Sequence, residues 1–363
     1  MTHTAKLLIV YFCLLATLSY PAYAAEPNVE TIARGLQTPW AIAFAPDGRI
    51  FVSERPGFIR VIEKGALAPE PWMRLDVIET GESGLLGLAL DPAFEKNRYV
   101  YAAYTYRDGG AMKNRLVRLR DEKEKGVLDR VLIDNVAGAR FHDGGRVRFG
   151  PDGKLYWTMG DAQQPNLAQD TKSLNGKILR LNTDGSFPAD NPFPKSPVYS
   201  YGHRNPQGLA WEPKSGRLYA TEHGPSGSPS CCHDEVNLVE PGKNYGWPAI
   251  YGTQTRDGMV PPMLESGAND TWAPGGAAFA TQGPWAGALL FTGLGGRALY
   301  RIVFDTKDPR KTVAFENYFK GRFGRLRDIV EGPDRALYLL TSNRDGRGRP
   351  AAEDDRVLRI TLK

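Results

Sequence analysis

The sequence has very little cysteine, and its cysteines cannot cross-link distant segments. Only 3 of the 363 residues are cysteine, and two of them, Cys231 and Cys232, are adjacent. In an oxidising compartment this pair either forms a strained vicinal disulfide or remains as two small residues in a polar loop. A shared zinc ion is not expected, because adjacent cysteines rarely ligate one tetrahedral metal together. Disulfides therefore do not hold this fold together.

Long apolar segments are also missing, apart from one at the N-terminus. Lys6 precedes an apolar stretch over residues 7–18, which is shorter than the roughly 20 residues of a membrane span. Residues 22–24, Ala-Tyr-Ala, then form the small-x-small pattern of a cleavage site. We expect residues 1–24 to be a signal peptide and residues 25–363 to form one domain. The protein is then periplasmic or secreted, soluble after cleavage and without a membrane span.

The sequence also lacks a strong excess of one charge. The 46 Lys and Arg residues against 41 Asp and Glu residues give a formal net charge of +5, and loss of Lys6 lowers this by one. Cations and anions are interspersed, and no basic run is interleaved with aromatic residues. We therefore expect a solvated surface of mixed charge and no nucleic-acid partner.

What the sequence has in excess is turn-forming residues. Its 40 glycines and 27 prolines together make up about 18% of the residues, against roughly 12% in an average protein. The fractions of charged (24%) and hydrophobic (41%) residues are those of ordinary globular proteins. The glycines have no three-residue period, which excludes collagen, and both residue types disfavour helix interiors. With 16 Tyr, 15 Phe and 7 Trp as well, the composition predicts an all-β protein.

One segment pattern occurs six times: an apolar pair, a turn of the Pro-Asp-Gly type, and an alternating strand rich in tyrosine. The first copy covers residues 42–54, and the prolines of the six copies are at positions 46, 92, 151, 213, 284 and 333. Proline presets such a turn and glycine accepts a positive φ, so each copy is a hairpin connection. Successive prolines are 46 to 71 residues apart, and a unit of that length holds four short strands. The repeat predicts a six-bladed β-propeller of four-stranded antiparallel sheets, or seven blades if one copy has lost the pattern.

Polar residues and all four histidines beyond the N-terminal segment gather between residues 140 and 251. His142 follows an aromatic residue on a glycine-rich loop, where a neutral imidazole suits a general base and a structural histidine is the alternative. Asp161 ends the following strand and is placed to orient that imidazole. Arg204 stands beside Asn205 on another loop, and its guanidinium suits an oxyanion or a carboxylate.

A third loop is rich in oxygen ligands. The Gly224-Pro225 step exposes consecutive carbonyl groups, and Asp234 and Glu235 follow shortly after. Carbonyl and carboxylate oxygens suit Ca²⁺ rather than zinc. The loop is therefore a candidate calcium site.

Several of these segments together resemble the soluble quinoprotein glucose dehydrogenase family, and most of all its aldose sugar dehydrogenase branch. The resemblance extends over residues 38–360. It rests on these segments: 81–88, His142 with the repeat that follows it, 201–209, 222–225, 234–238, 244–248 and 325–328.

The resemblance implies a propeller that binds pyrroloquinoline quinone (PQQ) and Ca²⁺ and oxidises an aldose at its anomeric carbon to the lactone. His142 would take the proton of the anomeric hydroxyl while a hydride passes to the quinone. Arg204 would stabilise the quinone oxyanion. Further cofactor contacts are implied for four side chains: Glu82, Asn205, Arg325 and Arg327.

The same resemblance implies two calcium ions. Main-chain carbonyl groups of Gly224 and Pro225 would bind the ion beside the cofactor, where Ca²⁺ acts as a Lewis acid. A second, structural ion would lie at Glu235 and Tyr245. An insertion over residues 226–233 stands next to the first of these sites.

The chain departs from the family in two ways that concern the cofactor and the sugar. It has no lysine near residues 294–297, where the glucose dehydrogenases hold the quinone, so either Arg297 substitutes or that contact is missing. Phe141 stands where those enzymes carry an acidic residue beside the base. Trp272 is a candidate stacking surface for sugar or cofactor, or else a structural residue.

Two other functions fit the same fold. A calcium-dependent lactonase would use a metal in the channel to activate water, which needs several carboxylates converging on one ion. A non-enzymatic propeller would bind a peptide or a glycan, but it leaves the histidine and arginine set without a role. We favour the dehydrogenase, with an aldose substrate, an unidentified electron acceptor, and a monomer or homodimer as the working unit.

Overall fold

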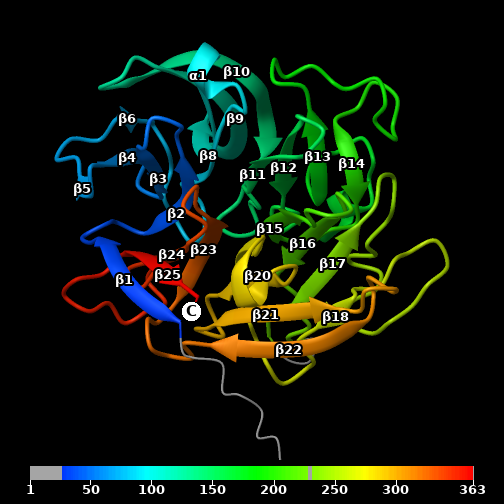
Figure 1. Ribbon diagram of the computed structural model, residues 1–363. Helices are drawn as coiled ribbons and strands as arrows, with labels where there is room; N and C mark the ends of the chain where they lie inside the picture. Colours follow the sequence, from blue (N-terminus) through cyan, green and yellow to red (C-terminus); the bar gives the residue numbers. More distant parts are fainter. Residues whose placement is uncertain (1–26, 228–230, 363) are drawn as a thin grey trace, which may run out of the picture.

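Figure 1 shows the chain as a ring of small antiparallel sheets around a central axis. The computed structural model describes residues 27–227 and 231–362, and the expected signal peptide lies outside these residues. The six sheets are the blades of a β-propeller, so the predicted fold class and the predicted number of blades are confirmed. Within the described part of the chain, no helix is long and apolar enough to cross a membrane.

The blades follow one another in chain order. The first contains β2 (Pro39–Phe44), β3 (Ile50–Glu54), β4 (Phe58–Glu63), β5 (Ala66–Leu67) and β6 (Met73–Arg74). The second contains β7 (Leu85–Leu90), β8 (Tyr99–Asp108), β9 (Ala111–Asp121) and β10 (Gly126–Ala137). The third contains β11 (Val147–Phe149), β12 (Leu155–Met159), β13 (Lys177–Leu181) and β14 (Val198–Tyr201).

The other three blades repeat this order. The fourth contains β15 (Pro206–Trp211), β16 (Leu218–Glu222), β17 (Glu235–Val239) and β18 (Leu264–Glu265). The fifth contains β19 (Pro274–Phe279), β20 (Leu289–Gly293), β21 (Leu299–Phe304) and β22 (Thr312–Tyr318). The sixth contains β23 (Leu326–Glu331), β24 (Leu337–Thr341), β25 (Val357–Thr361) and β1 (Asn28–Ala33).

The sixth blade closes the ring, because it is built from both ends of the described chain. β1 pairs antiparallel with β25, with Asn28 opposite Thr361, and so becomes the outermost strand of that blade. Figure 1 shows β1 in blue beside the red β25. Separating the first and last blades therefore requires breaking a strand pair inside one sheet.

The first strand of each blade lies nearest the central axis. β2 reads PWAIAF and β7 reads LLGLAL, and in both only the last residue is not buried. Such continuous apolar runs suit strands that are covered on both faces. Glycine permits the close approach of these strands, since a Cβ on Gly87 would collide with the carbonyl oxygen of Gly145 in front of the next blade.

Aromatic side chains fill the space between blades. The Phe51 ring of β3 packs edge-on against Trp72, with ring centroids 5.1 Å apart, and against Phe94 at 6.3 Å. Phe94 belongs to α1 (Phe94–Asn97), which lies between strands of the second blade. Trp72 and Phe94 are both buried, so the first and second blades are packed against each other.

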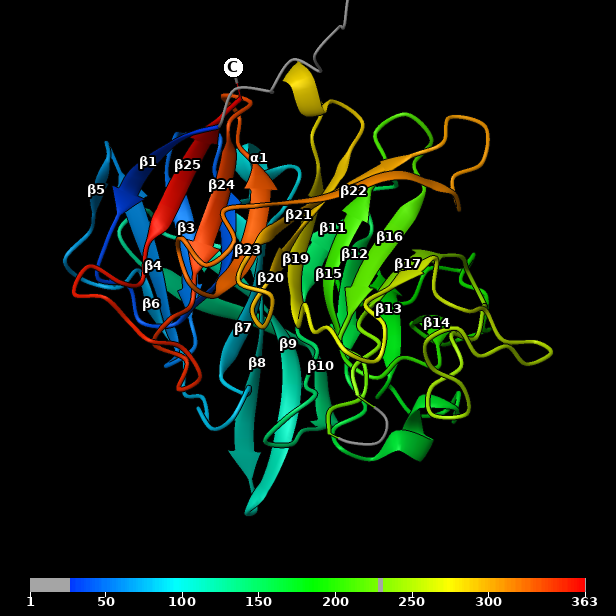
Figure 2. The same ribbon diagram turned by 90° about the horizontal axis from the view of Figure 1, so that it is seen from below.

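The six copies of the sequence repeat occupy equivalent places, between the first and the second strand of each blade. The connections are β2–β3, β7–β8, β11–β12, β15–β16, β19–β20 and β23–β24. Two of them contain short helices, α1 and the 3₁₀ helix η2 (Gly283–Trp285). All six lie at the same end of the ring, which we call the hairpin end. In Figure 2, α1 lies toward the upper edge of the molecule and the tip of the long β8–β9 hairpin reaches the opposite edge.

Candidate active site

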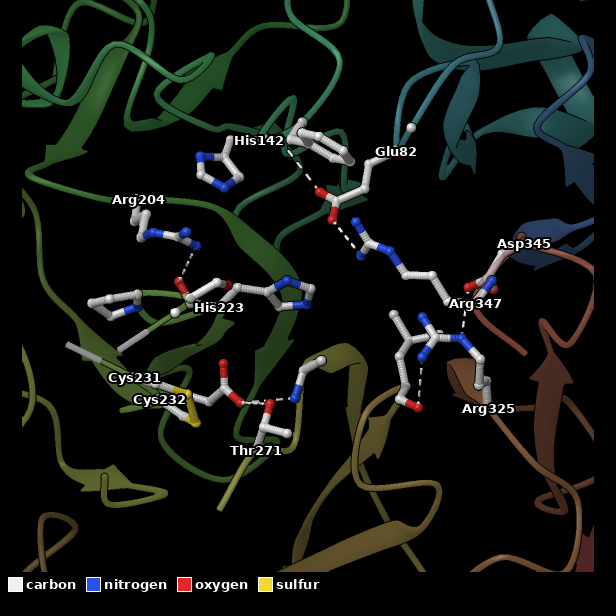
Figure 3. Close-up of a pocket in the computed structure, with 18 of the residues that line it drawn as sticks. Glu82, His142, Arg204, His223, Cys231, Cys232, Thr271, Arg325, Asp345 and Arg347 are labelled. Atoms are coloured by element: carbon white, nitrogen blue, oxygen red, sulfur yellow. Dashed lines mark hydrogen bonds and ion pairs between the residues drawn. A yellow bond between two sulfur atoms is a disulfide. The ribbon is translucent and has the colours of Figure 1, made fainter. Parts of the chain in front are cut away.

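A cavity of about 440 Å³ opens at the end of the propeller opposite the hairpins. We call it the central cavity, and Figure 3 shows the side chains around it. Its walls come from two kinds of loop, those that lead into the first strand of a blade and those that leave the second strand. The lining residues include Arg55, Glu82, Phe141, His142, Arg204, His223, Pro225, Asp234, Ala273, Leu294, Arg325, Arg327, Asp345 and Arg347.

His142 and Asp161 form a pair at this cavity, as the sequence predicted. His142 Nδ1 lies 2.8 Å from Asp161 Oδ1, and the carboxylate is buried while the imidazole is partly exposed. Because a carboxylate only accepts, the imidazole donates its Nδ1–H, and a neutral ring then keeps its lone pair on Nε2. Within the described residues, Nε2 has no protein partner. The arrangement is that of a base held by a carboxylate.

Asp161 is itself fixed on all sides. Its Oδ1 also accepts the backbone N–H of Gln163 at 2.8 Å, and its Oδ2 accepts the indole N–H of Trp247 at 2.8 Å. The Trp247 ring also lies 5.4 Å from the Arg204 guanidinium. Trp247 therefore connects the His142–Asp161 pair to Arg204.

The backbone around His142 is strained and tightly packed. His142 has a φ of 66°, which is the left-handed region, where a residue with a β-carbon is uncommon. Its carbonyl oxygen accepts the N–H of Ala162 at 3.0 Å. A Cβ on Gly160 would collide with that same carbonyl group, so only glycine fits beside the histidine. The strain is thus held in place by the loop that carries Asp161.

Arg204 reaches the cavity from the loop that leads into β15. Its backbone N–H donates to Glu222 Oε1, and Glu222 Oε2 binds the buried His203 at Nδ1 over 2.8 Å. The Arg204 guanidinium donates to the His223 carbonyl oxygen at 3.3 Å. Burial lowers the pKa of Arg204 below its ordinary value, because desolvation disfavours the charged form.

Arg327 is a second buried cation without a carboxylate partner within the described chain. Its Nη1 donates to Gln207 Oε1 at 2.9 Å, whereas its buried Nε has no partner. Burial lowers the pKa of Arg327 to about 9. Two buried guanidiniums that lack a counter-charge are costly unless an anion neutralises them. The cavity therefore fits an anionic group.

The remaining arginines at the cavity are held by carboxylates. Arg325 donates from Nε to Asp345 at 2.7 Å, and Arg347 donates to Glu82 Oε1 at 2.9 Å. Glu82 Oε2 lies 3.3 Å from Asn205 Nδ2. Burial opposes ionisation of Glu82, but the cations around it hold its pKa below the ordinary value.

The loop of the candidate calcium site lies against the disulfide. Cys231 and Cys232 are joined, and both line the central cavity (Figure 3). A Cβ on Gly224 would collide with the carbonyl oxygen of Cys232. Asp234 ties this loop to its neighbour: Oδ1 accepts the Gly224 N–H at 2.9 Å, and Oδ2 accepts two backbone N–H groups and the Thr271 hydroxyl at 2.7–3.0 Å. Both oxygens of Asp234 are thus already occupied.

Asp143 is a feature of the site that the sequence did not single out. Its Oδ1 accepts Asn114 Nδ2 at 2.8 Å and the Ala139 N–H at 3.0 Å, but its buried Oδ2 has no partner. Burial raises the pKa of Asp143 to about 7. The signal available in the sequence was an acidic residue directly after the candidate base. Asp143 and Asp161 thus differ in their environments. Within the described residues, one oxygen of Asp143 has no hydrogen-bond partner, whereas both oxygens of Asp161 accept hydrogen bonds.

Two predicted site residues, Trp272 and Arg297, do not line the central cavity. Trp272 is only 2% exposed, packs against Phe291 and other core rings and does not line the central cavity, which fits the structural alternative. The ring is buried because the preceding loop is drawn inward by the bond from the Trp272 N–H to Asp234. Arg297 lines a neighbouring cavity and not the central one.

The expected second calcium site remains a prediction. Tyr245 stacks on the His203 ring at 4.8 Å, and its hydroxyl donates to the Leu238 carbonyl oxygen. Glu235 is buried, and burial raises its pKa to about 8. The nearby Asn237 Oδ1 is buried without a partner. No cluster of three or more His, Cys, Asp or Glu side chains suited to a metal occurs among the residues 27–227 and 231–362.

Comparisons with known proteins agree with this geometry. Residues 36–352 match the family model of the glucose / sorbosone dehydrogenases. The aldose sugar dehydrogenase YliI of Escherichia coli K12 is 32% identical over 93% of this chain and 96% of its own length. The PQQ-bound aldose sugar dehydrogenase of Streptomyces coelicolor is 38% identical, with a TM-score of 0.83 over 93% of this chain and 99% of that one.

A further solved structure is similar along its whole length. A putative oxidoreductase (glucose dehydrogenase) of Thermus thermophilus is 47% identical, with a TM-score of 0.86 over 92% of this chain and 100% of that one. The likeness thus extends over nearly the whole of both chains.

Proposed function

Because the chain belongs to the glucose / sorbosone dehydrogenase family, a family of sugar dehydrogenases, we propose that it oxidises the anomeric carbon of aldoses to lactones with PQQ as oxidant. One observation carries the proposal: the His142–Asp161 pair faces a cavity that also holds Arg204 and Arg327, neither of which has a carboxylate partner among the described residues. A base and an anion site in one cavity suit a sugar hydroxyl beside an anionic cofactor.

The arginines are the groups that would hold the cofactor. PQQ carries carboxylates, and guanidinium forks bind carboxylates through paired N–H groups. Arg204, Arg325 and Arg327 line the cavity, and within the described residues the buried Arg204 and Arg327 form no ion pair. When bound, PQQ supplies a two-electron acceptor for the hydride of the sugar. Carbonyl oxygens of Gly224 and Pro225 would hold a Ca²⁺ beside it, a ligand type that this ion prefers.

The protein supplies the proton chemistry. His142 Nε2 takes the proton of the anomeric hydroxyl, and Asp161 then stabilises the imidazolium through the bond at Nδ1. Trp247 keeps Asp161 in place by donating to its second oxygen. Arg204 places a positive charge where negative charge develops on oxygen, in a buried site where electrostatic interactions are strong.

The lactonase alternative has less support. It needs several carboxylates free to face one ion, whereas both oxygens of Asp234 accept hydrogen bonds from the protein. A glycan-binding propeller gives no reason for two buried, unpaired guanidiniums beside a base. We further propose that the enzyme works in the periplasm after removal of residues 1–24.

The test is reconstitution of the protein that starts at residue 25 with PQQ and Ca²⁺, followed by assay of an electron-acceptor dye with several aldoses. We expect sugar-dependent bleaching and quinone absorbance that remains after desalting. In Arg327→Gln we expect weaker retention of the quinone, since a buried cation is lost. If the protein retains no quinone and no aldose bleaches the dye, the proposal is wrong.

A further inference from the structure

A second cavity, of about 710 Å³, adjoins the central one. The two share Leu294, Arg325 and Arg347 in their walls. Six arginines line this second cavity, against a single lining carboxylate, that of Asp354. They are Arg297, Arg322, Arg325, Arg347, Arg349 and Arg356. We call it the arginine cavity.

Three of the six arginines are ion-paired and three are not. Arg325 binds Asp345 at 2.7 Å, Arg347 binds Glu82 at 2.9 Å, and Arg356 binds Asp354 at 3.0 Å and Glu353 at 2.7 Å. Arg297, Arg322 and Arg349 have no carboxylate oxygen within 4.0 Å in the part of the chain that the structure describes. Their charges are permanent at physiological pH, so the cavity carries an uncompensated positive charge.

A buried asparagine fixes the segments that carry these arginines. Asn343 is 3% exposed, and its Oδ1 accepts the backbone N–H of Arg325 at 2.8 Å. Its Nδ2 donates to the Phe323 carbonyl oxygen at 2.9 Å and to Asp354 Oδ2 at 3.1 Å. One amide thus joins the loop before β23 to both ends of the loop between β24 and β25. The walls of the cavity are therefore preorganised.

Stacking also holds one of the unpaired arginines. The guanidinium of Arg322 lies 5.0 Å from the centroid of the Phe323 ring, and that of Arg356 lies 5.6 Å from the same ring. A stacked guanidinium keeps its edge N–H groups free for a ligand. Planar forks of this kind match the oxygens of a phosphate or a carboxylate in pairs.

We propose that the arginine cavity binds the anionic group, phosphate or carboxylate, of a sugar whose anomeric end lies in the central cavity. Because Leu294, Arg325 and Arg347 line both spaces, the two cavities are adjacent, and the proposed ligand extends from one to the other past these side chains. That the ligand is a sugar rests on the proposed function, whereas the anion site rests on the arginines alone. The enzyme then prefers acidic aldoses to neutral ones of the same ring.

The anion site is tested by calorimetry with pyrophosphate as the probe, on protein loaded with PQQ and Ca²⁺ so that the central arginines are occupied. The double variant Arg322→Gln/Arg349→Gln removes two exposed, unpaired charges, and we expect its affinity to fall at least tenfold. Arg335→Gln is the matched control, because Arg335 is an exposed arginine in the β23–β24 connection at the hairpin end. It should bind pyrophosphate as the wild type does.

The sugar is tested by comparing kcat/KM for glucuronic acid and for glucose 6-phosphate with that for glucose. We expect kcat/KM to be higher for one of the acidic sugars than for glucose. The ratio of these two kcat/KM values should fall about tenfold in the double variant but not in the control. The two acidic sugars distinguish a carboxylate ligand from a phosphate ligand.

The failures of the two proposals are distinguishable. If the protein takes up no PQQ, the calorimetry is carried out without it, and loss of binding in the double variant still supports the anion site. Equal pyrophosphate affinity in the double variant and the wild type overturns the anion site, whatever the enzyme does with glucose. If the ratio of kcat/KM for the acidic sugar to that for glucose is unchanged in the double variant, the proposal of an acidic substrate is wrong.

Discussion

At the hairpin end of the propeller buried charges are paired with one another, whereas at the cavity end several have no partner. Arg49 follows a repeated turn and binds both Asp47, at 2.8 Å, and the buried Asp121. The bond to Asp121 raises the pKa of Arg49 above its ordinary value. At the other end, Arg204 and Arg327 are buried without carboxylate partners within the described residues, and burial lowers the pKa of both. Charges at the hairpin end thus connect neighbouring blades, whereas those at the cavity end are the ones that the proposed function assigns to anion binding.

Glycine also has a different use at each end. Gly48 in the first hairpin has a φ of 90°, and nothing lies within 4 Å of the place where its Cβ would be. It is needed for its backbone conformation alone. Gly160 has no such φ, but a Cβ there would meet the His142 carbonyl group. These two glycines thus show two uses of the residue in this fold, a turn conformation at Gly48 and close packing at Gly160.

The largest effect is expected from replacing one buried aspartate at each end by asparagine. Asp161→Asn loses the acceptor that stabilises the imidazolium, so we expect kcat to fall about a thousandfold with PQQ retained. Asp121→Asn removes a partner of Arg49 and should lower the free energy of unfolding by about 3 kcal/mol with kcat unchanged. Steady-state kinetics and urea denaturation measure the two effects. A large loss of kcat in Asp121→Asn would contradict the division between the two ends.

The two glycines allow the same comparison with a smaller change. Gly160→Ala pushes against the backbone of the base, and we expect kcat to fall about a hundredfold. Gly48→Ala costs about 1 kcal/mol of stability, because alanine disfavours the positive φ, and leaves kcat as it is. If Gly160→Ala kept full activity, the tight packing around His142 would have no catalytic role.

The raised pKa of Asp143 predicts the direction in which the free energy of unfolding changes with pH. Burial raises the pKa of Asp143 from 3.8 to about 7, so the folded state keeps a proton that the unfolded state releases. Stability is therefore lost as the pH rises from about 4 to 7. In Asp143→Asn this loss is removed, so the free energy of unfolding of the variant relative to that of the wild type should rise by about 4 kcal/mol between pH 4 and pH 8. Denaturation curves across that range test this, and a difference that is constant with pH would refute it.

The smallest of these effects concerns Trp247. Trp247→Phe removes the N–H that binds Asp161 Oδ2 but keeps an aromatic ring near Arg204. Because Asp161 keeps its other bonds, we expect kcat to fall only about tenfold, with KM little changed. A loss as large as that of Asp161→Asn would mean that the indole does more than hold the carboxylate.

The hairpin end was predictable from the sequence because its structure is local. Each Pro-Asp-Gly turn is set by the conformational preferences of three or four adjacent residues, so six copies predicted six equivalent connections. The pairing of β1 with β25 depends on residues at opposite ends of the chain, and nothing in the repeat indicated it.

The cavity end was predictable only in part. His142, Asp161 and Arg204 stood out by residue type and spacing, and the structure brings all three to the central cavity or its wall. Trp247 and Arg347 join them from loops far along the chain, and loop conformation does not follow from local preference. For Trp272 the sequence left a stacking surface and a structural residue as alternatives, and the buried ring, with its backbone N–H bonded to Asp234, fits the structural one. The roles of the cofactor-binding residues remain predictions.

The most direct test of the account is His142→Gln, assayed after reconstitution with PQQ and Ca²⁺. Glutamine keeps a polar side chain of similar size but has no basic nitrogen. We predict that the variant retains quinone absorbance after desalting like the wild type, while its sugar-dependent kcat falls by about 10²- to 10⁴-fold. Retained quinone together with wild-type turnover would contradict the assignment of His142 as the base.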